Sequence, residues 1–150
     1  MPVYCDGRPC GGGSGGGGGA GGGSLLEWMV NKTGAPSVKG MVVDAGPIDN
    51  SFVSTGVNDD HPVGVVFDAG IADGSLCRVV KGGRAQVLLK NGTASTSGNW
   101  VKTADVAGRA DATLVGPPGF NVTHFQEIGH CQETKGAGVG VLAWCSLHFN

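Results

Sequence analysis

Short hydrophobic runs, each closed by turn-forming residues, recur along the chain from Leu25 onward. The runs are rich in Val, Leu or Phe, and each is bounded by Gly, Asn, Asp or Pro. In order they read LLEWMV, KGMVVDAGP, SFVSTGV, PVGVVFDAG, SLCRVVKGG and RAQVLLKNG. Closely spaced short strands with turn signals between them are typical of sandwiches and barrels, and no run shows a sustained helical period. The pattern predicts an all-β fold, a small β-barrel or sandwich of short antiparallel strands.

The pattern loosens over residues 93–124 and then returns. The looser segment contains one expected strand, NWVKTA, and a long connection around Gly116-Pro117-Pro118-Gly119. A connection of this length is usually an excursion, a partner contact or a mobile loop. Two further strands are expected, at 127–132 and 139–149.

Glycine-containing dipeptides mark two expected tight turns, at Gly82-Gly83 and Asn91-Gly92. Asn-Gly is the stronger signal, because both residues adopt the positive φ angles that two-residue hairpin loops require. A weak internal repeat is also visible. The segment PVGVVFDAGIADGSLCRVV, from Pro62, aligns with EIGHCQETKGAGVGVLAWC, from Glu127. The shared pattern predicts two related β-hairpins in one barrel.

A glycine-rich segment divides the chain. Residues 11–23 read GGGSGGGGGAGGG and account for much of the total of 30 glycines. Glycine loses more backbone entropy on ordering than any other residue, and this segment has no side chains whose burial would compensate. We therefore expect a short head at 1–10, a flexible linker at 11–23 and a globular domain at 24–150.

Charge and hydropathy narrow the expected partners. The formal net charge is −2, and no block of Lys or Arg supplies the basic surface typical of nucleic-acid binding. The apolar runs are too short to span a bilayer, and the N-terminus MPVYCDGRPC lacks the pattern of a secretory signal. We expect no nucleic-acid partner and no membrane partner, and synthesis in a cytoplasm.

Cysteine and histidine offer two candidate metal sites, both weak. Cys5 and Cys10 flank Asp-Gly-Arg-Pro, and free thiols are favoured over a disulfide or a metal site there. His130-Cys131 could act with Cys145 and His148. Adjacent residues of a strand point to opposite faces, so a core or surface role is favoured over a shared ligand sphere.

No catalytic constellation stands out. The Gly-x-Ser-x-Gly nucleophile elbow is absent and the acidic residues are scattered. We assign no catalytic residue, no cofactor and no metal, and expect that the protein is not an enzyme. Trp28, Trp100 and Trp144 could form a carbohydrate platform, but anchors of the core or of subunit contacts are favoured.

The segment from Asn31 to Asn150 resembles small bacteriophage capsid decoration proteins, also called cement or head-fibre proteins. The resemblance rests on NKTGAPSVKGMVV, HPVGVVFDAGIADGSLCRVV, GNWVKTADVAGRADA and HFQEIGHCQETKGAGVGVLAWCSLHFN. It implies a compact β-barrel or sandwich, often a homotrimer, that binds the major capsid protein on the outer surface of the virion. Residues 1–23 depart from any pattern of that family.

A decoration role needs contact surfaces rather than a polarised pocket. We expect the contacts in the arm, residues 1–28, and in the loop Gly116–Thr123. A coil of the linker's length has a root-mean-square span of roughly 20 Å, enough to reach a neighbouring subunit. The alternatives are a host-surface adhesin that binds glycans and an enzyme of unrecognised type. The candidate contact residues are Tyr4, Arg8, Leu25, Leu26, Trp28, Pro117, Pro118 and Phe120.

Overall fold

The computed structural model describes residues 4–5, 8–9, 23–114 and 125–149, and the described residues contain strands and no helix. Within these residues, no helix is long and apolar enough to cross a membrane. The strands are β1 (Tyr4–Cys5), β2 (Arg8–Pro9), β3 (Leu25–Asn31), β4 (Val42–Ala45), β5 (Ser51–Ser54), β6 (Gly64–Val66), β7 (Leu76–Leu88), β8 (Trp100–Thr103), β9 (Ala110–Thr113), β10 (Glu127–Cys131) and β11 (Leu142–Leu147). The predicted all-β class is confirmed.

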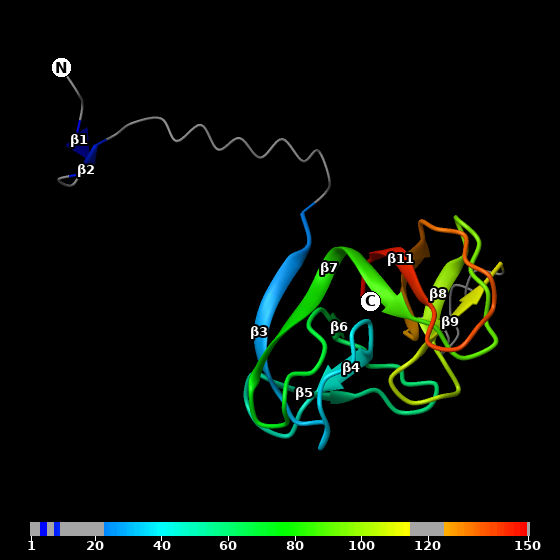
Figure 1. The fold of residues 1–150 in the computed structure, drawn as a ribbon, viewed down its shortest axis with the longest axis horizontal. Helices are drawn as coiled ribbons and strands as arrows, with labels where there is room; N and C mark the ends of the chain where they lie inside the picture. The colour runs from blue at the N-terminus through cyan, green and yellow to red at the C-terminus, as the bar shows by residue number, and fades with distance from the viewer. Residues whose placement is uncertain (1–3, 6–7, 10–22, 115–124, 150) are drawn as a thin grey trace.

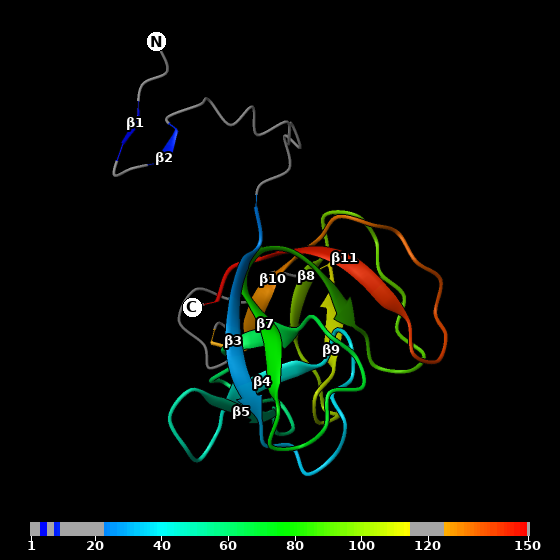
Figure 2. The same cartoon turned by 60° about the vertical axis from the view of Figure 1, so that its left-hand side comes forward.

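Strands β3 to β7 close into a five-stranded barrel. Their order is β3-β5-β4-β6-β7, and a further pairing of β3 with β7 closes the ring. Figures 1 and 2 show β3 beside the first part of β7, with β4, β5 and β6 completing this side of the molecule. The prediction of antiparallel strands holds except at one pair, because β3 and β5 run parallel, with Val30 opposite Ser51.

Alternating side chains of these strands fill the barrel. Successive residues of a strand point to opposite faces, so every second residue faces inward. On β7, for example, Cys77 and Val79 are fully buried, whereas Arg78 between them is half-buried. The inward-facing set consists of Met29, Val43, Phe52, Val66, Cys77 and Val79.

The second half of the chain repeats this pairing. The later part of β7 pairs with β11, and the order then continues β11-β10-β8-β9. Leu89, the residue after β7, forms a parallel bridge with Ala110, the first residue of β9. This bridge links the last strand of the order back to β7. That bridge has the place that the parallel β3–β5 pair has in the first half. The sheet therefore contains two copies of one five-strand arrangement, and both copies use β7.

The two copies correspond residue by residue. Val42 lies opposite Val65, and Trp100 lies opposite His130 at the equivalent point of the second copy. The N–H of Gly40 donates to Val66 O at 2.8 Å, and the N–H of Gly98 donates to Cys131 O at the same distance. Each inward residue of the first copy has a buried counterpart in the second; in the same order these are Val87, Val101, Ala110, Cys131, Ala143 and Cys145.

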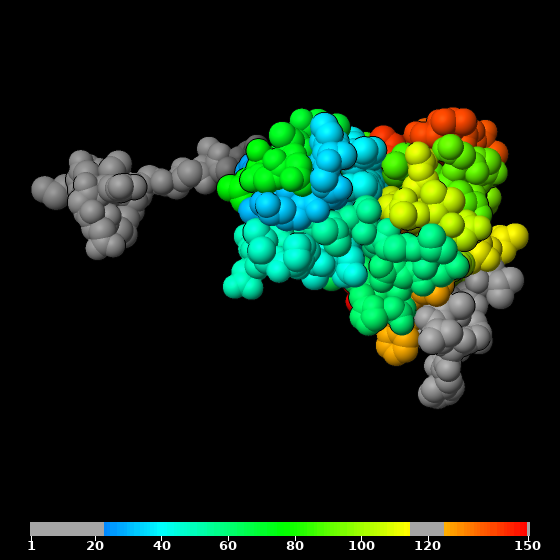
Figure 3. Space-filling model, turned by 90° about the horizontal axis from the view of Figure 1, so that it is seen from below, coloured from blue at the N-terminus to red at the C-terminus, as the bar shows by residue number. Residues whose placement is uncertain are grey.

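The repeat is thus real and larger than the sequence indicated. The two expected hairpins are present as β6–β7 and β10–β11. The expectation that both lie in one barrel is wrong, because each belongs to a different copy. Residues of the first copy occupy one side of the space-filling view and residues of the second copy the other (Figure 3).

A valine face joins the two copies. Val42, Val65 and Val80 point out of the first barrel and pack with the core of the second copy. All three side chains are almost completely buried. The part of the first barrel's outer face that these valines of β4, β6 and β7 form is therefore an internal interface of the protein.

Gly82-Gly83 does not form the expected turn. Both glycines lie inside β7, a continuous strand of 13 residues. The pairing with β3 ends at Gly82, and the pairing with β11 begins at Gly83. Gly83 has φ +83°, and a Cβ there would lie 2.7 Å from the carbonyl oxygen of Gly23. The glycines let β7 pass from one copy to the other.

The other turn and strands expected from the sequence agree more closely with the structure. A turn forms at Asn91-Gly92, as predicted, although it does not join two hairpin-paired strands. The expected strands NWVKTA, 127–132 and 139–149 correspond to β8, β10 and β11. Strand β9, Ala110–Thr113, was not predicted, because its residues ADAT carry a weak β signal.

Candidate functional site

Three of the candidate contact residues are exposed on the first part of β3. The exposed fractions are 65% for Leu25, 40% for Leu26 and 57% for Trp28. All of the first four residues of β3 are exposed, so both faces of the strand are open to solvent over this part. Leu76, 55% exposed, lies on the neighbouring strand. We call Leu25, Leu26, Trp28 and Leu76 the β3 surface.

The guanidinium of Arg78, held by an ion pair, lies against the indole of Trp28 in this surface. The Arg78 guanidinium lies 5.8 Å from the Trp28 ring centre and 4.5 Å from that of Phe67. The Asp68 carboxylate accepts from Arg78 Nη2 at 2.6 Å and from Arg78 Nε at 2.9 Å. This bidentate pair lowers the pKa of Asp68 below its ordinary value. An aromatic ring held against arginine is the kind of anchor that interfaces use.

The other candidate contact residues stay predictions. Tyr4 and Arg8 lie in β1 and β2, which pair antiparallel with Tyr4 opposite Pro9. The residues of the expected second contact loop, Pro117, Pro118 and Phe120, lie outside the described residues.

The tryptophans do not anchor the core, contrary to one of the expected roles. Trp28 is exposed, while Trp100 and Trp144 are half-buried. Trp144 packs against the Arg84 guanidinium at 4.5 Å, and Trp100 packs against the His130 ring at 4.3 Å. Trp28 is the most accessible aromatic platform of the three.

The candidate Cys/His cluster divides between two faces, as strand alternation predicted. Cys131 and Cys145 lie opposite each other and are buried in the core of the second copy. The neighbouring Cys131 thiol and burial raise the pKa of Cys145. His130 and His148 lie together on the other face, where His148 Nε2 is 2.9 Å from His130 Nδ1.

A residue that sequence reasoning did not single out joins the two histidines. His148 Nε2 lies 3.2 Å from Oε1 of the buried Glu127. A regular strand would place Glu127 and His130 on opposite faces, but a β-bulge between Glu127 and Gly129 brings them onto one face. Nothing in the local sequence except Gly129 indicates that bulge.

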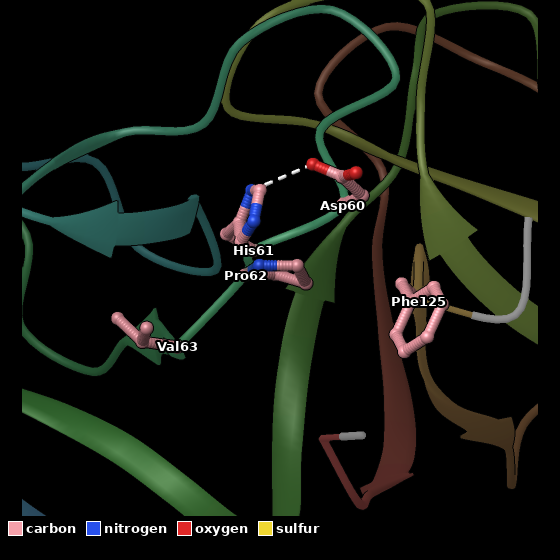
Figure 4. Close-up of a pocket in the computed structure, with 5 residues that line it drawn as sticks. All are labelled: Asp60, His61, Pro62, Val63 and Phe125. Atoms are coloured by element: carbon pink, nitrogen blue, oxygen red, sulfur yellow. Dashed lines mark ion pairs between the residues drawn. The ribbon is translucent and has the colours of Figure 1, made fainter. Parts of the chain in front are cut away.

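A shallow pocket of about 480 Å³ lies between the segment before β6 and the residue Phe125. Its lining residues are Asp60, His61, Pro62, Val63 and Phe125. The carboxylate of Asp60 pairs with His61 Nδ1 at 2.6 Å, across the pocket from the Phe125 ring (Figure 4). These lining residues include no serine, threonine or cysteine, so the carboxylate–imidazole pair has no nucleophile to activate among them.

The chain matches no family model, and no curated protein matches it.

Proposed function

We propose that this chain is a non-enzymatic structural virion protein that binds the outer surface of an assembled phage capsid and stabilises the shell. The observation that carries the proposal is the β3 surface, an exposed apolar strand face on a closed barrel. The capsid as partner rests on the sequence resemblance to decoration proteins. The proposed partner is the major capsid protein, and the proposed oligomer is a homotrimer.

The chemistry of the β3 surface suits a protein partner. Large apolar side chains that are exposed on a folded domain cost solubility, and several of them on one strand pair mark a candidate site of interaction. Leu25, Leu26 and Leu76 supply aliphatic area, and Trp28 supplies a large rigid ring. Interface energy concentrates in a few such aromatic and arginine anchors. A rigid strand face also loses little conformational entropy on binding.

The position of this surface suits a tethered protein. Strand β3 begins two residues after the glycine-rich segment 11–23. A head that binds one subunit would hold the β3 surface at high local concentration near the next. Contacts that exist only in the assembled shell stabilise the shell relative to free subunits by mass action.

Trp28 also supports the second candidate function, a glycan-binding head-fibre domain. Its ring is more than half exposed, as a sugar-stacking platform requires. The exposed leucines of the same surface favour a protein partner, because they add aliphatic area that the hydroxyl groups of a sugar would not match.

Co-sedimentation tests the proposal. The full chain is mixed with emptied capsids of the phage that encodes it, and separately with host cells. We expect saturable binding to capsids and a higher capsid melting temperature. Binding to host cells with none to capsids would replace the proposal with the glycan-binding function. Binding to neither would overturn both.

A further inference from the structure

We propose that Glu127, His130 and His148 form a binding site for a divalent transition-metal ion of the zinc class. The site lies at the outer face of the second copy, and it is independent of the proposed function. It uses one ligand atom from each residue: a carboxylate oxygen, His130 Nδ1 and His148 Nε2.

The ligand atoms already have nearly the spacing of a coordination sphere. All three lie within 4.8 Å of one another. His148 Nε2 is 2.9 Å from His130 Nδ1 and 3.2 Å from Glu127 Oε1. Metal–ligand distances of about 2.0–2.1 Å in a tetrahedral site place ligand atoms about 3.3 Å apart. Small side-chain rotations would therefore admit an ion between them.

The backbone fixes two of the ligands. Glu127 and His130 share a face because of the β-bulge in β10. Gly129 makes the bulge possible: it has φ +152°, and a Cβ there would lie 2.0 Å from the carbonyl oxygen of Ser146. The His130 ring rests against Trp100, with ring centres 4.3 Å apart. Such packing orients a ligand before the ion arrives.

The internal duplication shows that the fold does not require this cluster. The first copy builds the same strand pairs with Val65 where the second has His130, and with Val42 where the second has Trp100. The sequence repeat places Pro62 at the position of Glu127. Burying a carboxylate is costly unless a cation compensates it. The Glu/His cluster is therefore particular to the second copy and is not part of the repeated framework.

The two faces also differ in accessibility. In the first copy the valine face is covered by the second copy. In the second copy the matching face leaves His130 half-buried and the His148 side chain 45% exposed. Solvent therefore reaches the two histidines, while the Glu127 carboxylate is buried.

The donor set selects the class of ion. Two imidazoles and one carboxylate suit Zn²⁺, Co²⁺, Ni²⁺ or Fe²⁺, whereas Mg²⁺ and Ca²⁺ prefer all-oxygen sites. Three protein donors leave at least one position for water.

A second cluster, Asp59, Asp60 and His61, is a weaker candidate for the same chemistry. The Asp59 carboxylate accepts from the N–H of Gly56 at 2.8 Å and from the N–H of His61 at 2.9 Å. These bonds build a turn, and they occupy both oxygens of Asp59 with the backbone. This cluster serves as the internal control.

Titration of the full chain with Zn²⁺ by calorimetry, and with Co²⁺ by absorption, tests the site. We expect one ion per chain at this site and a Co²⁺ spectrum with d–d bands but no thiolate charge-transfer band. Removal of a second-shell partner typically weakens metal binding 10–100-fold. His130→Gln and His148→Gln, which each remove a ligand, should therefore weaken it by about 100-fold or more.

His61→Gln is the matched control and should leave affinity unchanged. Thermal unfolding without metal checks that each variant folds, and the exposed position of His148 makes its variant the decisive one. Three results would overturn the proposal: dissociation constants of about 1 mM or weaker, unchanged affinity in His148→Gln, or loss of binding in His61→Gln.

Discussion

Asp68 and Glu133 hold equivalent positions in the two copies of the repeat and make the same backbone contact. The Asp68 carboxylate accepts from the N–H of Arg78 at 3.2 Å, and the Glu133 carboxylate accepts from the N–H of Trp144 at 3.1 Å. The separations along the chain are 10 and 11 residues, so the second hairpin carries one extra residue. The longer glutamate side chain reaches across the longer connection.

Serines repeat the correspondence. Ser37 Oγ donates to Asp68 O at 2.6 Å, and Ser95 Oγ donates to Glu133 O at 2.8 Å. The two copies thus share their strand pairing, their buried positions, and these side-chain hydrogen bonds of the acidic and serine residues. They differ on the outer faces, where the first copy carries the covered valines and the second carries Glu127, His130 and His148.

The Asp68–Arg78 pair predicts a pH dependence of stability. The arginine lowers the pKa of Asp68 in the folded protein, so the carboxylate stabilises the fold above its unfolded pKa. That contribution is lost as the pH falls through the lowered folded pKa. Asp68→Asn should reduce the free energy of unfolding by about 1 kcal/mol at pH 7, after allowance for solvent screening.

Urea unfolding at pH 7 and below pH 4 measures this difference. The gap between wild type and Asp68→Asn should narrow as the pH falls, because the wild-type carboxylate becomes protonated. Asp49→Asn is the control, because it makes the same charge change at an exposed position. Its free energy of unfolding should vary with pH as that of the wild type does. A gap that is constant with pH would show that the ion pair does not stabilise the fold.

Gly129→Ala should unfold or severely destabilise the protein. A Cβ at this position would lie 2.0 Å from Ser146 O, and the φ of +152° is strained for any other residue. We expect a loss of at least about 3 kcal/mol, since both the bulge and the β10–β11 pairing must shift. Thermal unfolding by circular dichroism measures it. At Gly136, where a Cβ meets nothing within 4 Å, the same substitution should be nearly neutral.

Phe52→Ala tests the core of the first copy. Phe52 is fully buried among Val43, Val66 and Val79. Its removal should cost about 3–5 kcal/mol, because it leaves a cavity in a closed barrel. Val139→Ala is the control, with a side chain 84% exposed. Equal melting temperatures for the two variants would contradict the assigned core.

Much of the fold could be predicted from the sequence. The valine-rich runs placed most strands, because strands that are buried on both faces appear in the sequence as short apolar runs such as Val42-Val43 and Val65-Val66. The repeat was visible in the hairpin from Pro62 and the one from Glu127. Its extension to the whole domain was not, because pairs such as Phe52 and Ala110 share a buried position but no sequence identity.

The parts that could not be predicted depend on contacts distant in sequence. Gly82-Gly83 reads as a turn locally, but β3 and β11 pair on either side of it and keep β7 continuous. Glu127 was missed because a bulge changes its face. Leu25, Leu26 and Trp28, the contact residues expected from the sequence, are exposed, and the β3–β7 register adds Leu76 on the neighbouring strand.

Buried thiols should resist alkylation. Burial raises the pKa of Cys77, and the Cys131 thiol together with burial raises that of Cys145. Thiolates react and thiols do not, so iodoacetamide should modify neither residue in the folded protein at pH 8. Mass spectrometry of peptides measures the modification. Both residues should react fully in denaturant, and rapid labelling of Cys145 in the native state would contradict the packed core.

The capsid-binding account is tested most directly by substitution at Trp28. Trp28→Ala in the full chain should keep the melting temperature within a few degrees, since the ring is exposed and its contact with Arg78 is worth about 0.5–1 kcal/mol. The measurement is the fraction of chain that co-sediments with emptied capsids across a concentration series. We predict binding at least about tenfold weaker for Trp28→Ala, with Val139→Ala unchanged. Equal binding by Trp28→Ala and wild type would contradict the claim that the β3 surface binds the shell.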